Sequence, residues 1–209
     1  MLQPQAVEQG TWELLKGLMA IAELETFALV GGTNLALRFG HRLSIDLDLF
    51  TNEKFDPNKV FEAIGGVFPN TELSSKNENM LFLYVNDIKV DIVLFPYVYL
   101  QPIEEIDGVR MVSVPDIIAM KLHAVSTRGV KKDFWDIAEL LNYYSIADMV
   151  AFFKAKYSKQ DVWHILRSMI YFEDAEQQLN DPDPLKKVTW KQVKKKMETA
   201  VNQYIRNEV

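Results

Sequence analysis

The chain has 209 residues, of which 48% are hydrophobic and 25% charged, a balance typical of a globular protein and not of a disordered one. It contains no cysteine, which excludes disulfides, zinc–thiolate sites, iron–sulfur clusters and cysteine nucleophiles. The formal net charge of −6 argues against a broad surface that coats DNA regardless of sequence, but it leaves room for a local basic groove.

Up to about residue 112, short β-rich runs alternate with helical ones. The expected elements, in chain order, are a helix over roughly residues 5–24, a strand over 27–30, a helix from residue 33, a strand over 45–50, a helix over 56–64 and strands over 80–85 and 88–95. Asp56 before Pro57 is a typical helix start, and Asn86-Asp87 between two apolar runs indicates a β-hairpin.

Beyond residue 112 the sequence is helical in character. A serine or threonine stands three residues before an acid or glutamine at several places, a pattern that indicates capped helix starts. These pairs are Ser113 and Asp116, Ser145 and Asp148, Ser158 and Asp161, and Thr189 and Gln192. We therefore expect a mixed α+β fold, with a small sheet flanked by helices over residues 1–112 and a helical region over 113–209 that packs on this core.

Three acids are candidates for one site. Asp46 and Asp48 alternate with leucines on a predicted strand, so their side chains share a face, and Asp91 lies between apolar residues on a second strand. Carboxylate oxygens suit Mg²⁺ or Mn²⁺, and such ions activate an attacking oxygen and stabilise a leaving phosphate. Solvated acids on edge strands are the alternative for each residue alone; the conjunction of the acids favours the metal site.

The turn at Gly31, Gly32 and Thr33 is a candidate phosphate site. A strand that ends in glycines before a helix lets the backbone approach an anion closely, and the helix N-terminus favours negative charge there. Tight packing alone also explains such a turn. Its combination with the acids, within one stretch of chain, favours a nucleotide-binding unit.

This combination resembles the nucleotidyltransferase superfamily of the DNA polymerase β type, in which a glycine turn, a D-x-D pair and a third acid follow one another. The match consists of Gly31, Gly32, Thr33, Asp46, Asp48 and Asp91. More narrowly, the segments GGTNLAL and GHRLSIDLDLF resemble the AbiEii-type nucleotidyltransferase toxins of bacterial abortive-infection and toxin–antitoxin systems. The resemblance covers roughly residues 27–141, with threonine at position 33 where serine is frequent.

The family's second signature resembles KLHAVSTRGVKKDFWDIAEL, residues 121–140. The resemblance implies that Lys121 binds the triphosphate and that Asp133 orients it or accepts a proton. Lys132 stands where arginine is usual; it keeps the charge but loses the planar fork of a nucleotide contact. A structural ion-pair network between two helices is the alternative for these residues, and both interpretations are compatible.

Other basic residues have two interpretations each. Arg42 and Ser44, in the loop before the acids, are candidate contacts for phosphate or base, or a solvated loop. The lysines of the last helix form a solvated face or an RNA-contacting patch.

The sequence therefore predicts a metal-dependent nucleotidyltransferase that uses an NTP with Mg²⁺ or Mn²⁺. The resemblance implies tRNA as a candidate acceptor and a cognate antitoxin as a candidate partner. The alternatives are an inactive nucleotide- or RNA-binding relative and a small-molecule nucleotidyltransferase. With no bilayer-spanning apolar run and no signal-peptide pattern, we expect a cytoplasmic protein without membrane contact.

Overall fold

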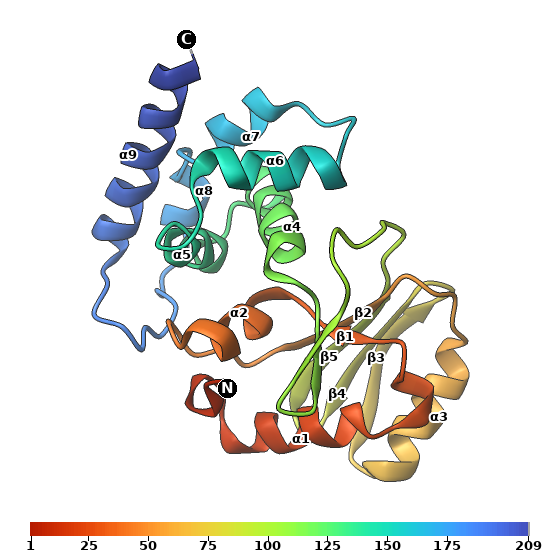
Figure 1. The fold of residues 1–209 in the computed structure, drawn as a ribbon. Coiled ribbons are helices and arrows are strands. Elements are labelled where there is room, and N and C mark those ends of the chain that lie inside the picture. Colours follow the sequence, from red (N-terminus) through yellow and green to blue (C-terminus); the bar gives the residue numbers. More distant parts are fainter. Residues whose placement is uncertain (209) are drawn as a thin grey trace. The chain divides into compact units, whose positions relative to one another are not determined.

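The structure is a computed structural model that describes residues 1–208 (Figure 1). The chain divides into two compact units, Met1–Val112 and Ser113–Val209. The first unit contains a seven-stranded mixed sheet with helices, and the second is helical, so the expected α+β class is confirmed. Among the described residues, no helix is both long enough and apolar enough to cross a bilayer.

The first unit is built around its sheet, with strand order β3-β4-β5-β2-β1-β7-β6. Its elements are η1 (Pro4–Ala6), α1 (Gln9–Met19), η2 (Ala22–Leu24), β1 (Ala28–Leu29), α2 (Gly31–Phe39), β2 (Leu47–Thr51), α3 (Pro57–Val67), β3 (Thr71–Asn77), β4 (Met80–Val85), β5 (Ile88–Leu94), β6 (Glu104–Ile106) and β7 (Val109–Met111). Strands β2 and β5 are parallel neighbours, whereas β1 runs antiparallel to β2. Most expected elements are present, with shifted ends.

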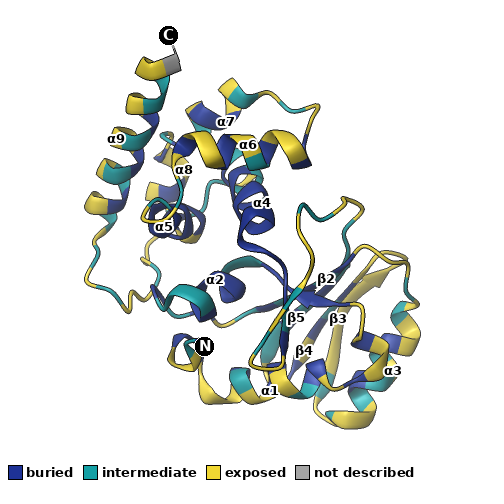
Figure 2. Ribbon diagram, viewed as in Figure 1, coloured by how far each residue is buried: buried dark blue, intermediate teal, exposed yellow. Residues whose placement is uncertain are grey.

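The core of the first unit lies on one face of the sheet. Fully buried apolar side chains alternate with more exposed residues along three strands: Leu47 and Leu49 of β2, Leu81, Leu83 and Val85 of β4, and Val90 and Ile92 of β5. They form one cluster with apolar side chains of α1 and α3. Because side chains alternate along a strand, Asp48 and Asp91 project from the other face. Figure 2 shows the dark blue buried residues along these strands and the exposed outer side of α3.

Some elements differ from the sequence-based expectation. The first helix is shorter than residues 5–24, because 3₁₀ turns flank it and Ile21 adopts an extended conformation. The edge strand β3 was not expected, since nearly all of its residues are exposed and it lacks an apolar alternation. Strands β6 and β7 have three residues each and were also missed.

The second unit consists of helices: α4 (Val114–Thr127), α5 (Lys131–Leu140), α6 (Ile146–Lys156), α7 (Val162–Ser168), α8 (Glu173–Glu176) and α9 (Trp190–Glu208). The rings of Phe134, Phe172 and Trp190 contact one another, with centroid separations of 5.1, 5.7 and 5.8 Å. They tie α5 and α8 to the start of α9 through buried aromatic surface.

The predicted helix starts are largely confirmed. Ser113 caps α4, Ser145 and Asp148 form a complete capping box, and Thr189 and Gln192 exchange hydrogen bonds at the start of α9. The pair at Ser158 is wrong as a capping box. Asp161 itself caps α7, because its carboxylate accepts from the backbone N–H of Trp163.

Candidate active site

Asp48 and Asp91 are paired positions on the adjacent parallel strands β2 and β5. Their side chains therefore lie on the same face of the sheet, as neighbours. Asp46 comes just before β2 and outside its ladder. All three acids are half-buried, so their carboxylates are neither fully solvated nor enclosed in the core.

Gly31 lies against the carboxylate of Asp48. It is the first residue of α2 and has φ +72°, a conformation that favours glycine. A Cβ at Gly31 would lie 2.4 Å from Oδ2 of Asp48, a distance that real Cβ atoms do not adopt. The backbone N–H of Val30 donates to the carbonyl of Asp48 at 2.9 Å. The glycine turn and the D-x-D pair of the sequence are therefore one local structure.

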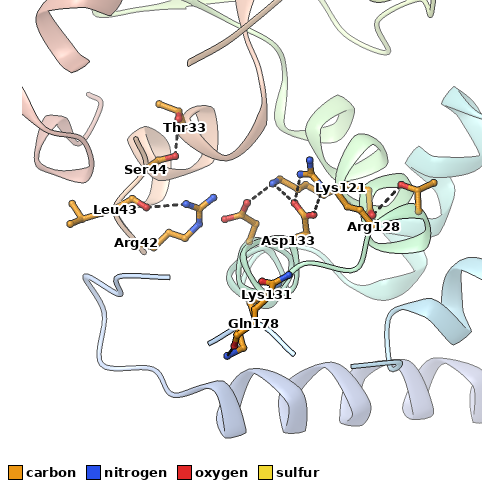
Figure 3. Close-up of polar contacts among 12 residues, drawn as sticks. Thr33, Arg42, Leu43, Ser44, Lys121, Arg128, Lys131, Asp133 and Gln178 are labelled. Carbon is orange, nitrogen blue, oxygen red and sulfur yellow. Dashed lines mark hydrogen bonds and ion pairs between the residues drawn. The ribbon is translucent and has the colours of Figure 1, made fainter. Parts of the chain in front are cut away.

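The hydroxyl of Thr33 is also directed at the acid loop. It contacts the Ser44 hydroxyl at 2.8 Å and donates to the backbone carbonyl of Asp46. Thr33 and Ser44 are both buried, and Figure 3 shows the contact between them. Both residues thus hold the segment that carries Asp46 against α2, a role that the sequence alone did not predict for them.

Arg42 is buried, although loop arginines are usually solvated. Its guanidinium donates to the backbone carbonyl of Leu43 at 2.9 Å (Figure 3). Burial of a charged residue together with hydrogen bonding removes the solvated-loop interpretation for Arg42. Its role in nucleotide binding stays a prediction.

Lys89 is a neighbour of the acids that sequence reasoning missed. Its Nζ lies 2.6 Å from Oδ2 of Asp91. The signal was present, because Lys89 stands two residues before Asp91 in β5 and alternation places both on one face.

The three carboxylates match a hard divalent cation in chemistry, since Mg²⁺ and Mn²⁺ prefer oxygen ligands. Oδ1 of Asp91 is buried and has no hydrogen-bond partner among residues 1–208, as expected of an oxygen available to a cation. Within the same residues, no group of three or more His, Cys, Asp or Glu side chains is arranged so that it could hold a metal. The ligand set Asp46, Asp48 and Asp91 stays a proposal.

In the second unit, Lys121 joins α4 to α5 through buried ion pairs. Its Nζ lies 2.8 Å from Oδ1 of Asp133 and 2.6 Å from Oδ2 of Asp136, and both carboxylates are fully buried. Arg128 also contacts Asp133, with its Nε 2.8 Å from Oδ2 (Figure 3). The structural ion-pair network is therefore present, whether or not Lys121 also contacts a nucleotide.

The electrostatics of Asp133 follow from these contacts. Burial alone would raise the pKa of its carboxyl, but the charge of Lys121 and the hydrogen bond from Arg128 outweigh this effect and lower the pKa. Asp133 is thus held as a carboxylate. Lys132, by contrast, is exposed on α5, and its proposed nucleotide contact stays a prediction.

The lysines around the last helix are partly engaged within the second unit. Lys186 contacts Glu139 at 2.5 Å, Lys194 contacts Glu176, and Lys196 donates to Asn142. The solvated-face interpretation is therefore incomplete for these residues. Val193, Met197 and Val201 form the buried face of α9, and Tyr204 is partly buried.

Known proteins resemble this chain over nearly its whole length. The model of the family described as "Nucleotidyl transferase AbiEii toxin, Type IV TA system" matches residues 13–206. An uncharacterised protein of Aquifex aeolicus (strain VF5), aq_aa25, is 30% identical over 202 residues, which are 93% of this chain and 96% of that protein.

Solved structures share the fold at low sequence identity. JHP933 from Helicobacter pylori has a TM-score of 0.60 at 18% identity, covering 99% of this chain and 94% of that one. MenT4, a nucleotidyltransferase toxin from Mycobacterium tuberculosis H37Rv, has a TM-score of 0.50 at 12% identity, covering 96% of this chain and 92% of that one.

Proposed function

The chain is a nucleotidyltransferase that belongs to the AbiEii toxin family, and we propose that it transfers a nucleoside monophosphate from an NTP to a hydroxyl group of tRNA. We further propose that the reaction depends on Mg²⁺ or Mn²⁺. In this proposal the protein acts as the toxin of a toxin–antitoxin pair and is restrained by a cognate antitoxin protein.

The observation that carries the proposal is the contact of Gly31 with the carboxylate of Asp48, beside Asp91 on the neighbouring parallel strand. The start of a helix favours anions, and adjacent carboxylates favour a divalent cation. A metal–triphosphate complex carries both charges. The anion-binding helix end and the adjacent acids together therefore support nucleotide chemistry more strongly than either feature does alone.

In the proposed reaction, an acceptor oxygen attacks the α-phosphorus of the NTP. The new bond joins that oxygen to the α-phosphorus, the bond from the α-phosphorus to the bridging oxygen breaks, and pyrophosphate leaves with its electron pair. Asp91 accepts the proton of the acceptor hydroxyl. A divalent ion bound by Asp46, Asp48 and Asp91 would lower the pKa of that hydroxyl and neutralise charge on the phosphates.

The remaining predicted residues have binding roles in the proposal. The backbone of Gly31 and Gly32, with the hydroxyl of Thr33, holds the β- and γ-phosphates, and Arg42 and Ser44 support the loop that leads to the acids. The proposed contacts from the second unit are Lys121, Lys132 and Asp133. Lys121 would balance the charge of the leaving pyrophosphate, and Asp133 would orient its ammonium.

The test is to incubate the purified full chain with each labelled NTP, Mg²⁺ and total RNA, and to resolve the products by size. We expect label in the tRNA fraction with one NTP or a subset. Asp48→Asn should abolish it. Asp87→Asn, a matched change in the exposed β4–β5 turn where asparagine accepts the positive φ of 65°, should not.

The outcomes separate the parts of the proposal. Label in another RNA, or only in an added small-molecule acceptor such as an aminoglycoside, would overturn the tRNA assignment and keep the transferase. Equal labelling by Asp48→Asn and the unaltered chain would place catalysis elsewhere. Activity that survives removal of divalent ions with a chelator would overturn the metal dependence.

A further inference from the structure

Lys89 places a positive charge on the acid-bearing face of the sheet. It lies opposite Tyr84 of β4, and its ammonium contacts Asp91 at 2.6 Å. The Lys89 side chain is 43% exposed, whereas that of Asp91 is 16% exposed. The lysine therefore approaches the acid from the solvent side, along a flexible four-carbon stem that can swing away without disturbing the core.

The field at Lys89 comes from more than its direct partner. Partial burial acts to lower the pKa of Lys89, but the hydrogen bond to Asp91 and the charges of Asp91, Asp46 and Asp48 outweigh it and raise the pKa. Each of the proposed metal ligands thus stabilises the same ammonium. The direct contact of its ammonium is with Asp91.

The contact uses only half of the Asp91 carboxylate. Oδ2 binds Lys89, whereas Oδ1 is buried without a hydrogen-bond partner in the described part of the chain. A metal ion that coordinates both oxygens of Asp91, or Oδ2 alone, lies beside the Lys89 ammonium. A divalent ion and an ammonium repel each other, and both cannot bind one oxygen at full strength.

We propose that Lys89 is the internal counter-ion of the Asp46, Asp48 and Asp91 site, and that a divalent cation binds by displacing its ammonium from Asp91. This inference rests on the proposed function, because it takes the three acids as metal ligands. In the absence of metal, Lys89 offsets the mutual repulsion of the acids and holds Asp91 on the site face. Lys89 is therefore a positioning residue that sets the affinity of the site for the metal.

The test measures binding of Mn²⁺ alone to the full chain, by electron paramagnetic resonance of the free ion, at constant pH. Lys89→Gln should lower the Kd for Mn²⁺ by about tenfold, because the competing charge is gone. Lys59→Gln is the matched control: it makes the same change at an exposed position of α3, which packs on the opposite face of the sheet, and it should leave the Kd unchanged.

Thermal unfolding provides an independent readout. In a chelator, Lys89→Gln should melt below the unaltered chain, because the acids lose their counter-ion, and Mn²⁺ should raise its melting temperature more than that of the unaltered chain. If Lys89→Gln does not fold, Lys89→Arg carries the test. Its guanidinium stays charged and binds carboxylates through two N–H groups, so it should weaken Mn²⁺ binding.

The two proposals fail differently. If Mn²⁺ binds and Asp48→Asn abolishes binding, but Lys89→Gln leaves the Kd unchanged or raises it, Lys89 is only a structural ion-pair partner and this inference is overturned. If the unaltered chain binds no Mn²⁺, or binds it regardless of Asp48, the proposed metal site fails and this inference fails with it.

Discussion

Gly31 and Asp48 lie so close together that a Cβ on the glycine would stand 2.4 Å from Oδ2 of the acid. Gly31→Ala should therefore displace the Asp48 carboxylate and strain a backbone at φ +72°, at a cost of about 1–2 kcal/mol for the conformation alone. We expect transfer activity to fall at least about tenfold for a carboxylate displaced in this way. Chemical denaturation and NTP turnover measure the two effects.

Gly65→Ala is the matched control for this substitution. Gly65 lies in α3, and apart from its chain neighbours and the backbone of its own helix, no described atom stands within 4 Å of the position that its Cβ would take. Alanine in a helix is favoured over glycine by roughly 0.5–1 kcal/mol, so this variant should be more stable and equally active. If both variants behave alike, the contact with Asp48 does not matter for the reaction.

Asp48→Ala should abolish transfer without harming the metal-free fold. In a chelator, removal of one of three neighbouring acids relieves like-charge repulsion, so the melting temperature should stay the same or rise. Calorimetry in the presence of a chelator measures it. A large fall in melting temperature would mean that Asp48 is a structural residue.

Lys121→Met should destabilise the second unit by about 3–5 kcal/mol, because it removes the ammonium from two buried carboxylates. Lys156→Met is the comparison: it breaks the fully buried pair with Asp116, which joins α6 to α4, and should cost a similar amount. Urea unfolding of both variants tests the expectation. A loss below about 1 kcal/mol for Lys121→Met would be the value of an exposed pair and would contradict the buried network.

Lys121→Arg separates stability from nucleotide use. Arginine keeps the charge, so the variant should fold, but its planar guanidinium does not reproduce a compact ammonium. We expect a higher KM for the NTP at a temperature where the variant is fully folded. An unchanged KM and kcat would leave Lys121 with its structural role alone.

Asp133 makes the stability of the second unit sensitive to acid. The pKa of its carboxyl is lowered in the folded state. Its contribution to the free energy of unfolding is therefore fully present at pH values above the unfolded-state pKa of about 3.9, and it is lost as the pH falls from there toward the folded-state pKa. Melting temperatures from pH 7 to pH 3 should show the difference between the unaltered chain and Asp133→Asn shrinking below about pH 4. A difference that stays constant across this range would contradict a lowered pKa.

The sequence predicted those parts of the fold that have a strong local pattern. Asp56 and Pro57 mark the start of α3, and Asn86 and Asp87, both with positive φ, form the turn between β4 and β5. Strand β3 escaped prediction because its pairing with β4, and not its own apolar content, holds it in the sheet. A connection of two residues, 78 and 79, joins the two strands, but without apolar alternation in β3 the local sequence does not identify the hairpin.

The candidate site was predictable in its residue types and less so in its contacts. Alternation correctly placed Asp91 on the face opposite Val90 and Ile92, and the parallel register then aligns it with Asp48. Alternation also places Lys89 on the face of Asp91, but the pattern does not show which partner its ammonium contacts. For the same reason, the sequence did not predict that Thr33 contacts Ser44.

The parallel pairing of β2 with β5 has a consequence for the order of events during synthesis. The chain that separates these strands holds α3, β3 and β4, so Asp48 gains its neighbour Asp91 only after the whole stretch has left the ribosome and the β4–β5 hairpin has formed. A nascent chain that ends before β5 has the glycine turn and the first two acids, but not the third. Under the proposed function, the three-acid site is therefore incomplete on the ribosome until most of the first unit has emerged.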